Sequence, residues 1–192
     1  KDPLAFFSAE WLYERYDCDV VVLIRHPAAF YSSLKMQNWH FDFNHFLDQP
    51  LLMDHLLAPF RAEMEAMVEK EQNLIDQSIL LWNCIHHIIL GYQHRHKDWL
   101  FIKHEDLSLQ PLRQFEAVYE HLNLAYTDHV KAVITAATGA HNLAEQTHKN
   151  EHIRDSKKNI LNWKTRLSEE EICTIRTGTA KIAEQFYDKS DW

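Results

Sequence analysis

Arg25, Ser32 and Ser33 are the residues whose types and spacing point most clearly to chemistry. They follow a run of five apolar residues, Val20–Ile24, and Pro27 lies between the arginine and the serines. The forked donors of a guanidinium match a phosphate, and serine hydroxyls can complete such a site. The alternative is that Arg25 is an ordinary solvated residue after a strand. The local pattern leaves both interpretations open.

The elements around these residues favour an anion site. The run Val20–Ile24 is short and does not alternate, which predicts a strand covered on both faces in a parallel sheet. Pro27 predicts a helix through Leu34, because its fixed φ and missing N–H suit a first turn. Ligands of open parallel sheets bind at the carboxyl ends of the strands, which is where Arg25 is expected.

The composition predicts one compact domain that covers residues 1–192. The chain has 46% hydrophobic and 12% aromatic residues, enough for a large core. Its net charge of −8 argues against a nucleic-acid partner, since phosphate backbones are bound mainly by surplus Lys and Arg. Three widely spaced cysteines fit a reducing, cytoplasmic setting. No apolar stretch approaches the roughly 20 residues of a transmembrane segment.

The fourteen histidines raise the question of a metal site. They include the pair His86 and His87 and the pair His148 and His152. None of these clusters has carboxylate or thiol partners at a recognised ligand spacing. Surface or capping positions are therefore favoured, and we predict no structural metal.

Apolar residues at intervals of three and four predict a largely helical chain. The predicted helices are Phe6–Arg15, Pro27–Leu34, Pro50–Glu69, Asn73–His94, Pro111–Leu122, Thr127–Ala137 and a last one that starts at the capping box of Ser168 and Glu171. The short apolar run Trp99–Ile102 predicts a second parallel strand. The fold class is therefore a helix-rich α/β domain with a short parallel sheet.

Two segments lack a regular period. Gln37–Gln49 is rich in aromatic residues and is either a loop near a substrate or a plug between helices. Residues 139–163 are polar and become basic towards Lys157 and Lys158. They predict a long loop that is either a lid over an anionic ligand or a solvated surface loop.

Three segments together resemble bacterial members of the sulfotransferase family. Arg25-His-Pro with Ser33 eight residues after the arginine is similar to the family's 3′-phosphate site. The segment Phe101-Ile-Lys-His-Glu-Asp-Leu is similar to the family's strand beside the adenine, with His104 where a tyrosine is usual. Arg154-Asp-Ser-Lys, followed by Trp163-Lys, resembles the C-terminal lid. The resemblance implies that Arg154, Ser156 and Lys157 close over the 3′-phosphate.

The first residues, Lys1-Asp2-Pro3, look like the Lys-x-Pro turn of several branches of the family. Lys1 would then neutralise charge on the leaving phosphate oxygen. Asp2 is either a general base toward the acceptor or a helix-capping residue.

The resemblance implies a P-loop NTPase-like three-layer α/β/α fold and 3′-phosphoadenosine 5′-phosphosulfate as co-substrate, without a metal. The acceptor would be a hydroxyl, with a carbohydrate or glycolipid as one candidate. The family's glycine-rich loop for the 5′-phosphosulfate is absent, so we expect the C-terminal portion of a longer enzyme that is inactive by itself. The alternatives are a P-loop-type kinase, which would use a nucleoside triphosphate and Mg²⁺, and a non-catalytic nucleotide-binding relative.

Overall fold

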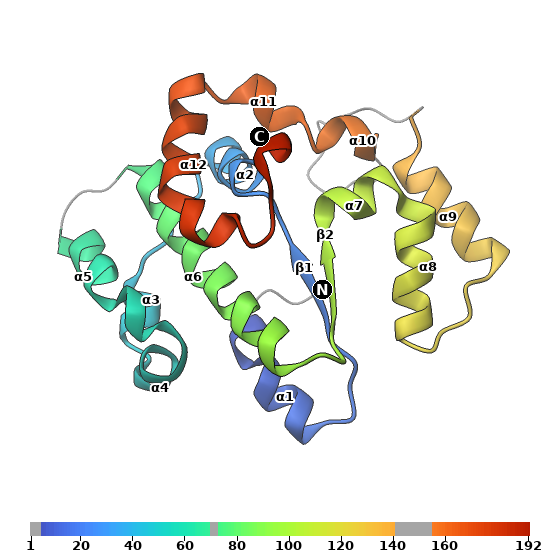
Figure 1. Ribbon diagram of the computed structural model, residues 1–192, viewed down its shortest axis with the longest axis horizontal. Coiled ribbons are helices and arrows are strands. Elements are labelled where there is room, and N and C mark those ends of the chain that lie inside the picture. Colours follow the sequence, from blue (N-terminus) through green and yellow to red (C-terminus); the bar gives the residue numbers. More distant parts are fainter. Residues whose placement is uncertain (1–4, 70–72, 141–154) are drawn as a thin grey trace. The chain divides into compact units, whose positions relative to one another are not determined.

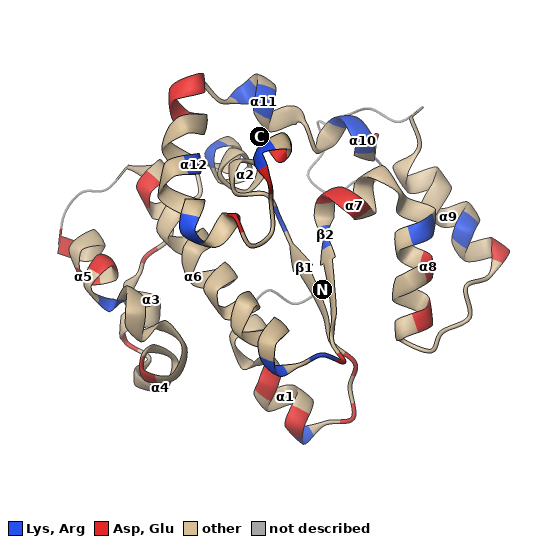
Figure 2. Ribbon diagram, viewed as in Figure 1, with Lys and Arg blue, Asp and Glu red and all other residues tan. Residues whose placement is uncertain are grey.

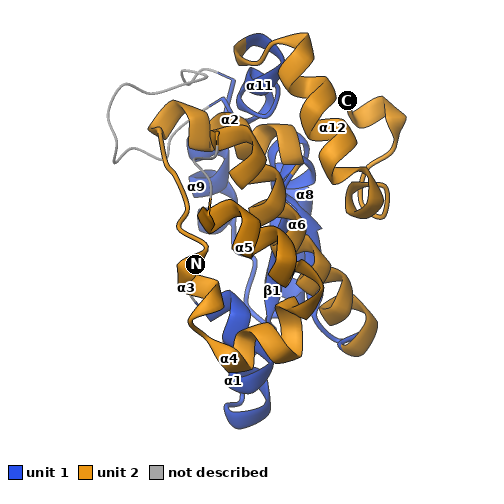
Figure 3. Ribbon diagram, turned by 90° about the vertical axis from the view of Figure 1, so that its left-hand side faces the viewer, with its two compact units in different colours: residues 1–25, 96–165 blue, residues 26–95, 166–192 orange. Residues whose placement is uncertain are grey.

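The computed structural model describes residues 5–69, 73–140 and 155–192 (Figure 1). The chain divides into two compact units, coloured separately in Figure 3. Unit 1 comprises residues 1–25 and 96–165, and unit 2 comprises residues 26–95 and 166–192. Each unit is described by itself below.

Unit 1 holds a pair of parallel strands, β1 (Val21–Ile24) and β2 (Leu100–Lys103). Both predicted strands are confirmed, and each begins one residue later than expected. The prediction that β1 is covered on both faces is wrong. Val22 is 6% and Ile24 3% exposed, whereas Val21 and Leu23 are 38% and 39% exposed. β1 therefore buries only every second side chain, as a half-covered strand does.

In the sequence of unit 1, helices come before β1 and after β2. They are η1 (Ala5–Ser8), α1 (Ala9–Arg15), α7 (His104–Leu109), α8 (Pro111–His121), α9 (Asp128–Thr138), α10 (Ser156–Asn159) and α11 (Asn162–Arg166), whose last residue is assigned to unit 2. The side chain of Thr127 caps α9 by accepting from the Val130 N–H at 3.3 Å. The predicted starts at Pro111 and Thr127 are confirmed.

The predicted polar loop over residues 139–163 begins outside any helix at Gly139 and Ala140, but the prediction is wrong where two short helices follow, from Ser156 on. Asp155 caps α10 by accepting from the Lys158 N–H, so a short helix begins there. The helix α11 follows, and its Trp163 is only 4% exposed. The single buried tryptophan gives too weak an apolar pattern to predict a helix of one turn. Residues 141–154 of the predicted loop lie outside the described residues.

Unit 2 is built around three helices that pack against one another, α2 (Pro27–Gln37), α6 (Leu74–Arg95) and α12 (Glu169–Ala183). All three helices were predicted, but the predicted α2 ended at Leu34, three residues before its end in the structure. The shorter elements are α3 (Asn44–Leu47), α4 (Pro50–Leu52), η2 (Met53–Leu57), η3 (Ala58–Phe60), α5 (Arg61–Glu69) and η4 (Lys189–Asp191). Trp82 and Tyr92 of α6 and Ile175 of α12 are at most 1% exposed and form part of the core.

The predicted continuous helix over Pro50–Glu69 is interrupted. A π-helical turn over Met53–Leu57 and a 3₁₀ turn at Pro59 separate α4 from α5. Proline has no N–H to continue a helix, and the π turn adds a residue to the helical period. Met53 and Leu57 are fully buried, whereas Leu52 and Leu56 are half-buried.

The aromatic segment Gln37–Gln49 contributes to the core. Phe43 is 2% and Phe46 5% exposed, and the rings of Phe41 and Phe46 lie 4.8 Å apart. This packing supports the plug interpretation for these three rings. Trp39 differs, because it is 67% exposed.

No helix in the described ranges is long and apolar enough to cross a membrane.

Candidate functional site

Arg25 and His104 lie at the carboxyl edge of the parallel strands. Ile24 at the end of β1 pairs in register with Lys103 at the end of β2. Arg25 follows β1 and His104 follows β2, so the structure brings these two predicted residues to neighbouring positions. Arg25 is half-buried, and its Nε is shielded from solvent. The ends of the two strands therefore bring the Arg25 guanidinium, which is always charged, and an imidazole to adjacent positions of the backbone.

His104 begins the helix α7, which is not among the predicted helices. Lys103 takes the N-cap position with extended backbone angles. Glu105 and Asp106 follow in the first turn, where carboxylates interact favourably with the helix dipole. Figure 2 shows this reversal of charge, from the basic end of β2 to the acidic start of α7. The basic residues next to this edge are therefore Arg25 and Lys103, and acidic residues follow them in α7.

Ser156 attaches α10 to the neighbouring helices of unit 1. Its Oγ lies 2.9 Å from the carbonyl oxygen of Ser108 in α7 and 3.3 Å from that of Thr138 in α9. A hydroxyl has only one proton to donate, and here a backbone carbonyl accepts it. A phosphate would have to replace that acceptor. The neighbouring Lys157 is exposed and available to solvent.

Asp155 fixes the start of α10 by its contacts with Lys158. The Asp155 carboxylate is buried, accepts from the Lys158 N–H at 3.3 Å and pairs with the Lys158 Nζ at 3.2 Å. Burial raises the pKa of Asp155, but the contacts with the Lys158 backbone and ammonium outweigh it and hold that pKa below its usual value. The carboxylate is therefore charged at neutral pH and is used for structure.

Ser33 belongs to unit 2, where it lies on α2. The helix begins at Pro27, and the Nδ1 of His26 accepts from the Ala28 N–H at 3.3 Å. The imidazole is buried, with its ring centre 4.8 Å from that of Tyr187 and 4.5 Å from that of Trp192. The first free amide of α2 is thus capped from within the protein.

The two serines of α2 differ in exposure. Ser32 is 3% exposed, and its Oγ has no hydrogen-bond partner within the described ranges. Ser33 is half-buried. Successive residues of a helix differ by about 100° around its axis, so the two side chains cannot serve the same face. Ser33 is the more accessible of the two to a ligand.

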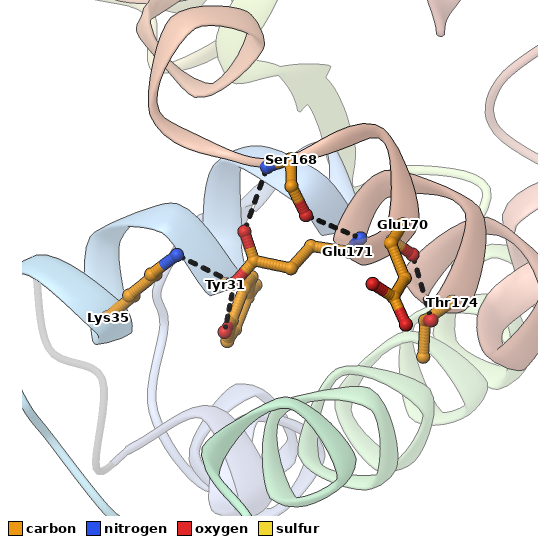
Figure 4. Close-up of polar contacts among 6 residues, drawn as sticks. All are labelled: Tyr31, Lys35, Ser168, Glu170, Glu171 and Thr174. Atoms are coloured by element: carbon orange, nitrogen blue, oxygen red, sulfur yellow. Dashed lines mark hydrogen bonds and ion pairs between the residues drawn. The ribbon is translucent and has the colours of Figure 1, made fainter.

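A carboxylate that the sequence did not assign to any site joins α2 to α12 (Figure 4). The Glu171 Oε1 accepts from the Tyr31 hydroxyl at 2.9 Å and from the Lys35 Nζ at 2.6 Å. The Oε2 accepts from the Ser168 N–H at 2.9 Å, and the Glu171 N–H donates to the Ser168 Oγ at 3.1 Å. The last two bonds are the predicted capping box, which is confirmed.

The electrostatics of this cluster agree with its contacts. Burial, together with the hydrogen bond to Glu171, raises the pKa of Tyr31 to about 12. Burial also raises the pKa of Glu171, but donation by Lys35, Ser168 and Tyr31 outweighs it and leaves the pKa below its usual value. The capping box was a signal for Glu171 in the sequence. Nothing there linked it to Tyr31, which is 140 residues away along the chain.

Three predicted site residues, Lys1, Asp2 and Arg154, lie outside the described residues. Within the described ranges, no group of three or more His, Cys, Asp or Glu residues is placed to hold a metal ion.

Comparisons of this chain with protein-family models, with curated proteins and with solved structures found no match. Its function is therefore inferred from the sequence pattern and the geometry above.

Proposed function

We propose that this chain is the nucleotide-binding part of a sulfotransferase that uses 3′-phosphoadenosine 5′-phosphosulfate. The observation that carries the proposal is the junction between β1 and α2. A parallel strand ends at Ile24, Arg25 follows at its carboxyl end, and a helix that begins at Pro27 carries Ser33. The same order of elements supports our proposal that the fold is a P-loop NTPase-like three-layer α/β/α fold.

In this proposal Arg25 and Ser33 bind the 3′-phosphate. A guanidinium is always charged and can donate two parallel hydrogen bonds to one phosphate. His104 would contact the adenine, because it follows β2 at the position next to Arg25. Lys157, exposed on α10, and Arg154 would add positive charge over the same phosphate. Ser156 would contribute only after giving up its backbone acceptor.

The reaction would be an in-line transfer. The acceptor hydroxyl attacks sulfur, the bond from sulfur to the bridging phosphate oxygen breaks, and that oxygen leaves with the electron pair. The hydroxyl proton passes to a base, for which Asp2 is one candidate. Lys1 would stabilise the charge on the leaving oxygen, and catalysis would rest on positioning and charge neutralisation. A carbohydrate or glycolipid hydroxyl remains the candidate acceptor.

The proposal is tested by measuring the affinity of the protein for adenosine 3′,5′-bisphosphate and for AMP, which lacks the 3′-phosphate. We expect Arg25→Ala to weaken bisphosphate binding by more than about tenfold, the loss of a charge-assisted contact, and to affect AMP much less. Isothermal titration calorimetry gives both constants.

The matched control is Arg15→Ala. Arg15 ends α1, ahead of β1, so it belongs to the amino side of the strand, and its guanidinium lies 4.8 Å from the Trp11 ring centre. An unchanged bisphosphate affinity in Arg25→Ala, or an equal loss in Arg15→Ala, would contradict the proposal. Tighter binding of Mg²⁺·ATP than of the bisphosphate would favour a kinase instead.

A further inference from the structure

The cluster around Glu171 holds one face of α2. Tyr31 and Lys35 are four residues apart, so they lie on the same side of the helix, and both donate to the Glu171 Oε1 (Figure 4). The Lys35 Nζ also lies 6.0 Å from the centre of the Tyr31 ring. The three side chains thus form one connected contact between α2 and α12.

Ser33 lies between Tyr31 and Lys35 in sequence but on the other side of the helix. At about 100° per residue, its direction is roughly 180° from the midpoint of the two donors. The contacts of Tyr31 and Lys35 with Glu171 fix the rotation of α2 about its axis. They therefore also fix the direction in which Ser33 points.

We propose that Glu171 is a positioning residue for the 3′-phosphate site, because it sets the rotation of α2 and thereby the placement of Ser33. This inference rests on the proposed function, since it assigns Ser33 to the phosphate. Glu171 does not touch the nucleotide in this role and acts only through α2.

The capping box explains why a carboxylate is needed at this position. The Ser168 N–H occupies the Glu171 Oε2, which leaves Oε1 for the two donors of α2. A glutamine has one acceptor oxygen, so either the Ser168 N–H or the donors of α2 would face an NH₂ group. The side chain of Glu171 is only 22% exposed, so water replaces these contacts poorly.

The test compares Glu171→Gln with Glu170→Gln. Glu170 is the adjacent, exposed residue of α12, and in Figure 4 its carboxylate is turned towards Thr174 rather than towards α2. The bond that Glu170 does make there, from the Thr174 hydroxyl, is accepted by its backbone carbonyl at 2.9 Å and survives the substitution. The two variants thus make the same chemical change on neighbouring positions.

We expect Glu171→Gln to weaken adenosine 3′,5′-bisphosphate binding by about fivefold and AMP binding by less than about twofold. A fivefold loss of affinity is the effect expected when one contact between two interacting residues is lost. Glu170→Gln should change neither affinity. Lys35→Met should weaken bisphosphate binding in the wild type and add little in Glu171→Gln, because both act through one contact. The side chain of Lys35 is exposed, so Lys35→Met is expected to fold. If Glu171→Gln does not fold, Lys35→Met alone tests the proposal.

The outcomes separate this inference from the proposed function. Equal losses for bisphosphate and AMP, or a loss in Glu170→Gln, would show a general structural effect and overturn the positioning role. Bisphosphate binding that depends on Arg25 but not on Glu171 or Lys35 would overturn it and leave the proposed function standing. Binding that does not depend on Arg25 would overturn both.

Discussion

His86 shows how burial decides what a single histidine does in this protein. Its ring stacks on Trp82 at 3.7 Å and is 3% exposed. The Nδ1 lies 2.9 Å from the Trp82 carbonyl oxygen, so Nδ1 carries the proton and donates it. The Nε2 is buried without a hydrogen-bond partner in the described part of the chain. Burial lowers the pKa of His86 to about 3 and outweighs the backbone contact with Trp82, which acts in the opposite direction.

We predict that His86 makes the fold sensitive to acid. Its folded pKa of about 3 lies below the ordinary value of 6.5, so the unfolded chain binds more protons between these values. Stability is therefore complete above about pH 6.5 and falls as the pH drops, by about 2 kcal/mol at pH 5. Urea unfolding of His86→Phe should show a shallower loss between pH 6.5 and 5.

The control for this prediction is His129→Gln. His129 is exposed on α9, so its replacement should leave the slope of stability against pH as in the wild type. An unchanged slope in His86→Phe would show that other groups cause the acid sensitivity.

The sequence predicted single residues where the signal was local. The capping box of Ser168 and Glu171 was predicted in full, because both partners lie within one helical turn. The two parallel strands that Arg25 and His104 follow were predicted from two short apolar runs. The bonds of Glu171 to Tyr31 and Lys35 were not predictable, since they form only when two helices distant in sequence pack.

At the scale of elements, α6 and α12 approach each other closely at Gly178. A Cβ at this position would lie 2.9 Å from the Cγ2 of Ile79. The Asn83 Nδ2 also donates to the Gly178 carbonyl at 2.9 Å. A glycine in the middle of α12 thus permits a contact that any side chain would disturb.

We predict that Gly178→Ala destabilises the protein. Alanine is better than glycine in a helix by about 1 kcal/mol, but overpacking costs about 1–3 kcal/mol, so the net effect is a loss. Thermal unfolding should show a melting temperature lower by about 2–4 °C for each kcal/mol lost.

The matched variant is Gly91→Ala in α6. A Cβ there would meet only the end of the Arg95 side chain, 3.0 Å away at Nη1, and that end can move aside. We expect an unchanged or higher melting temperature. A stabilising Gly178→Ala would mean that α6 and α12 adjust without cost.

Elements were predictable where proline or strong periodicity marked them. Pro27 correctly predicted the start of α2. The spacing of apolar residues predicted both ends of α6 to within one residue. The interruption at Met53–Leu57 was not predictable, because a π turn follows from packing rather than from residue type. The exposed Val21 and Leu23 were also missed, since a run of apolar residues does not show how many faces are covered.

At the scale of the molecule, neither unit is a continuous stretch of chain. Unit 2 combines residues 26–95 with residues 166–192, and α12 packs against both α2 and α6. Ile175 and Ile182 of α12 are 1% and 8% exposed, so they fill part of that core. Residues 26–95 alone leave this apolar surface open to water.

We predict that a fragment of residues 26–95 does not fold cooperatively by itself, because burial of apolar surface provides most of the stability. A peptide of residues 166–192 should restore helical content when it is added. Circular dichroism during heating measures both effects. A sharp thermal transition in the fragment alone would contradict the prediction.

The division of unit 2 also sets an order of events on the ribosome. α2 and α6 emerge first, and the whole second segment of unit 1, residues 96–165, is synthesised before α12 exists. At roughly 5–20 residues per second, this interval lasts several seconds, longer than most small helical domains need to fold. During that time the nascent chain exposes the apolar surface that α12 later covers, the kind of surface that promotes aggregation of incompletely folded chains.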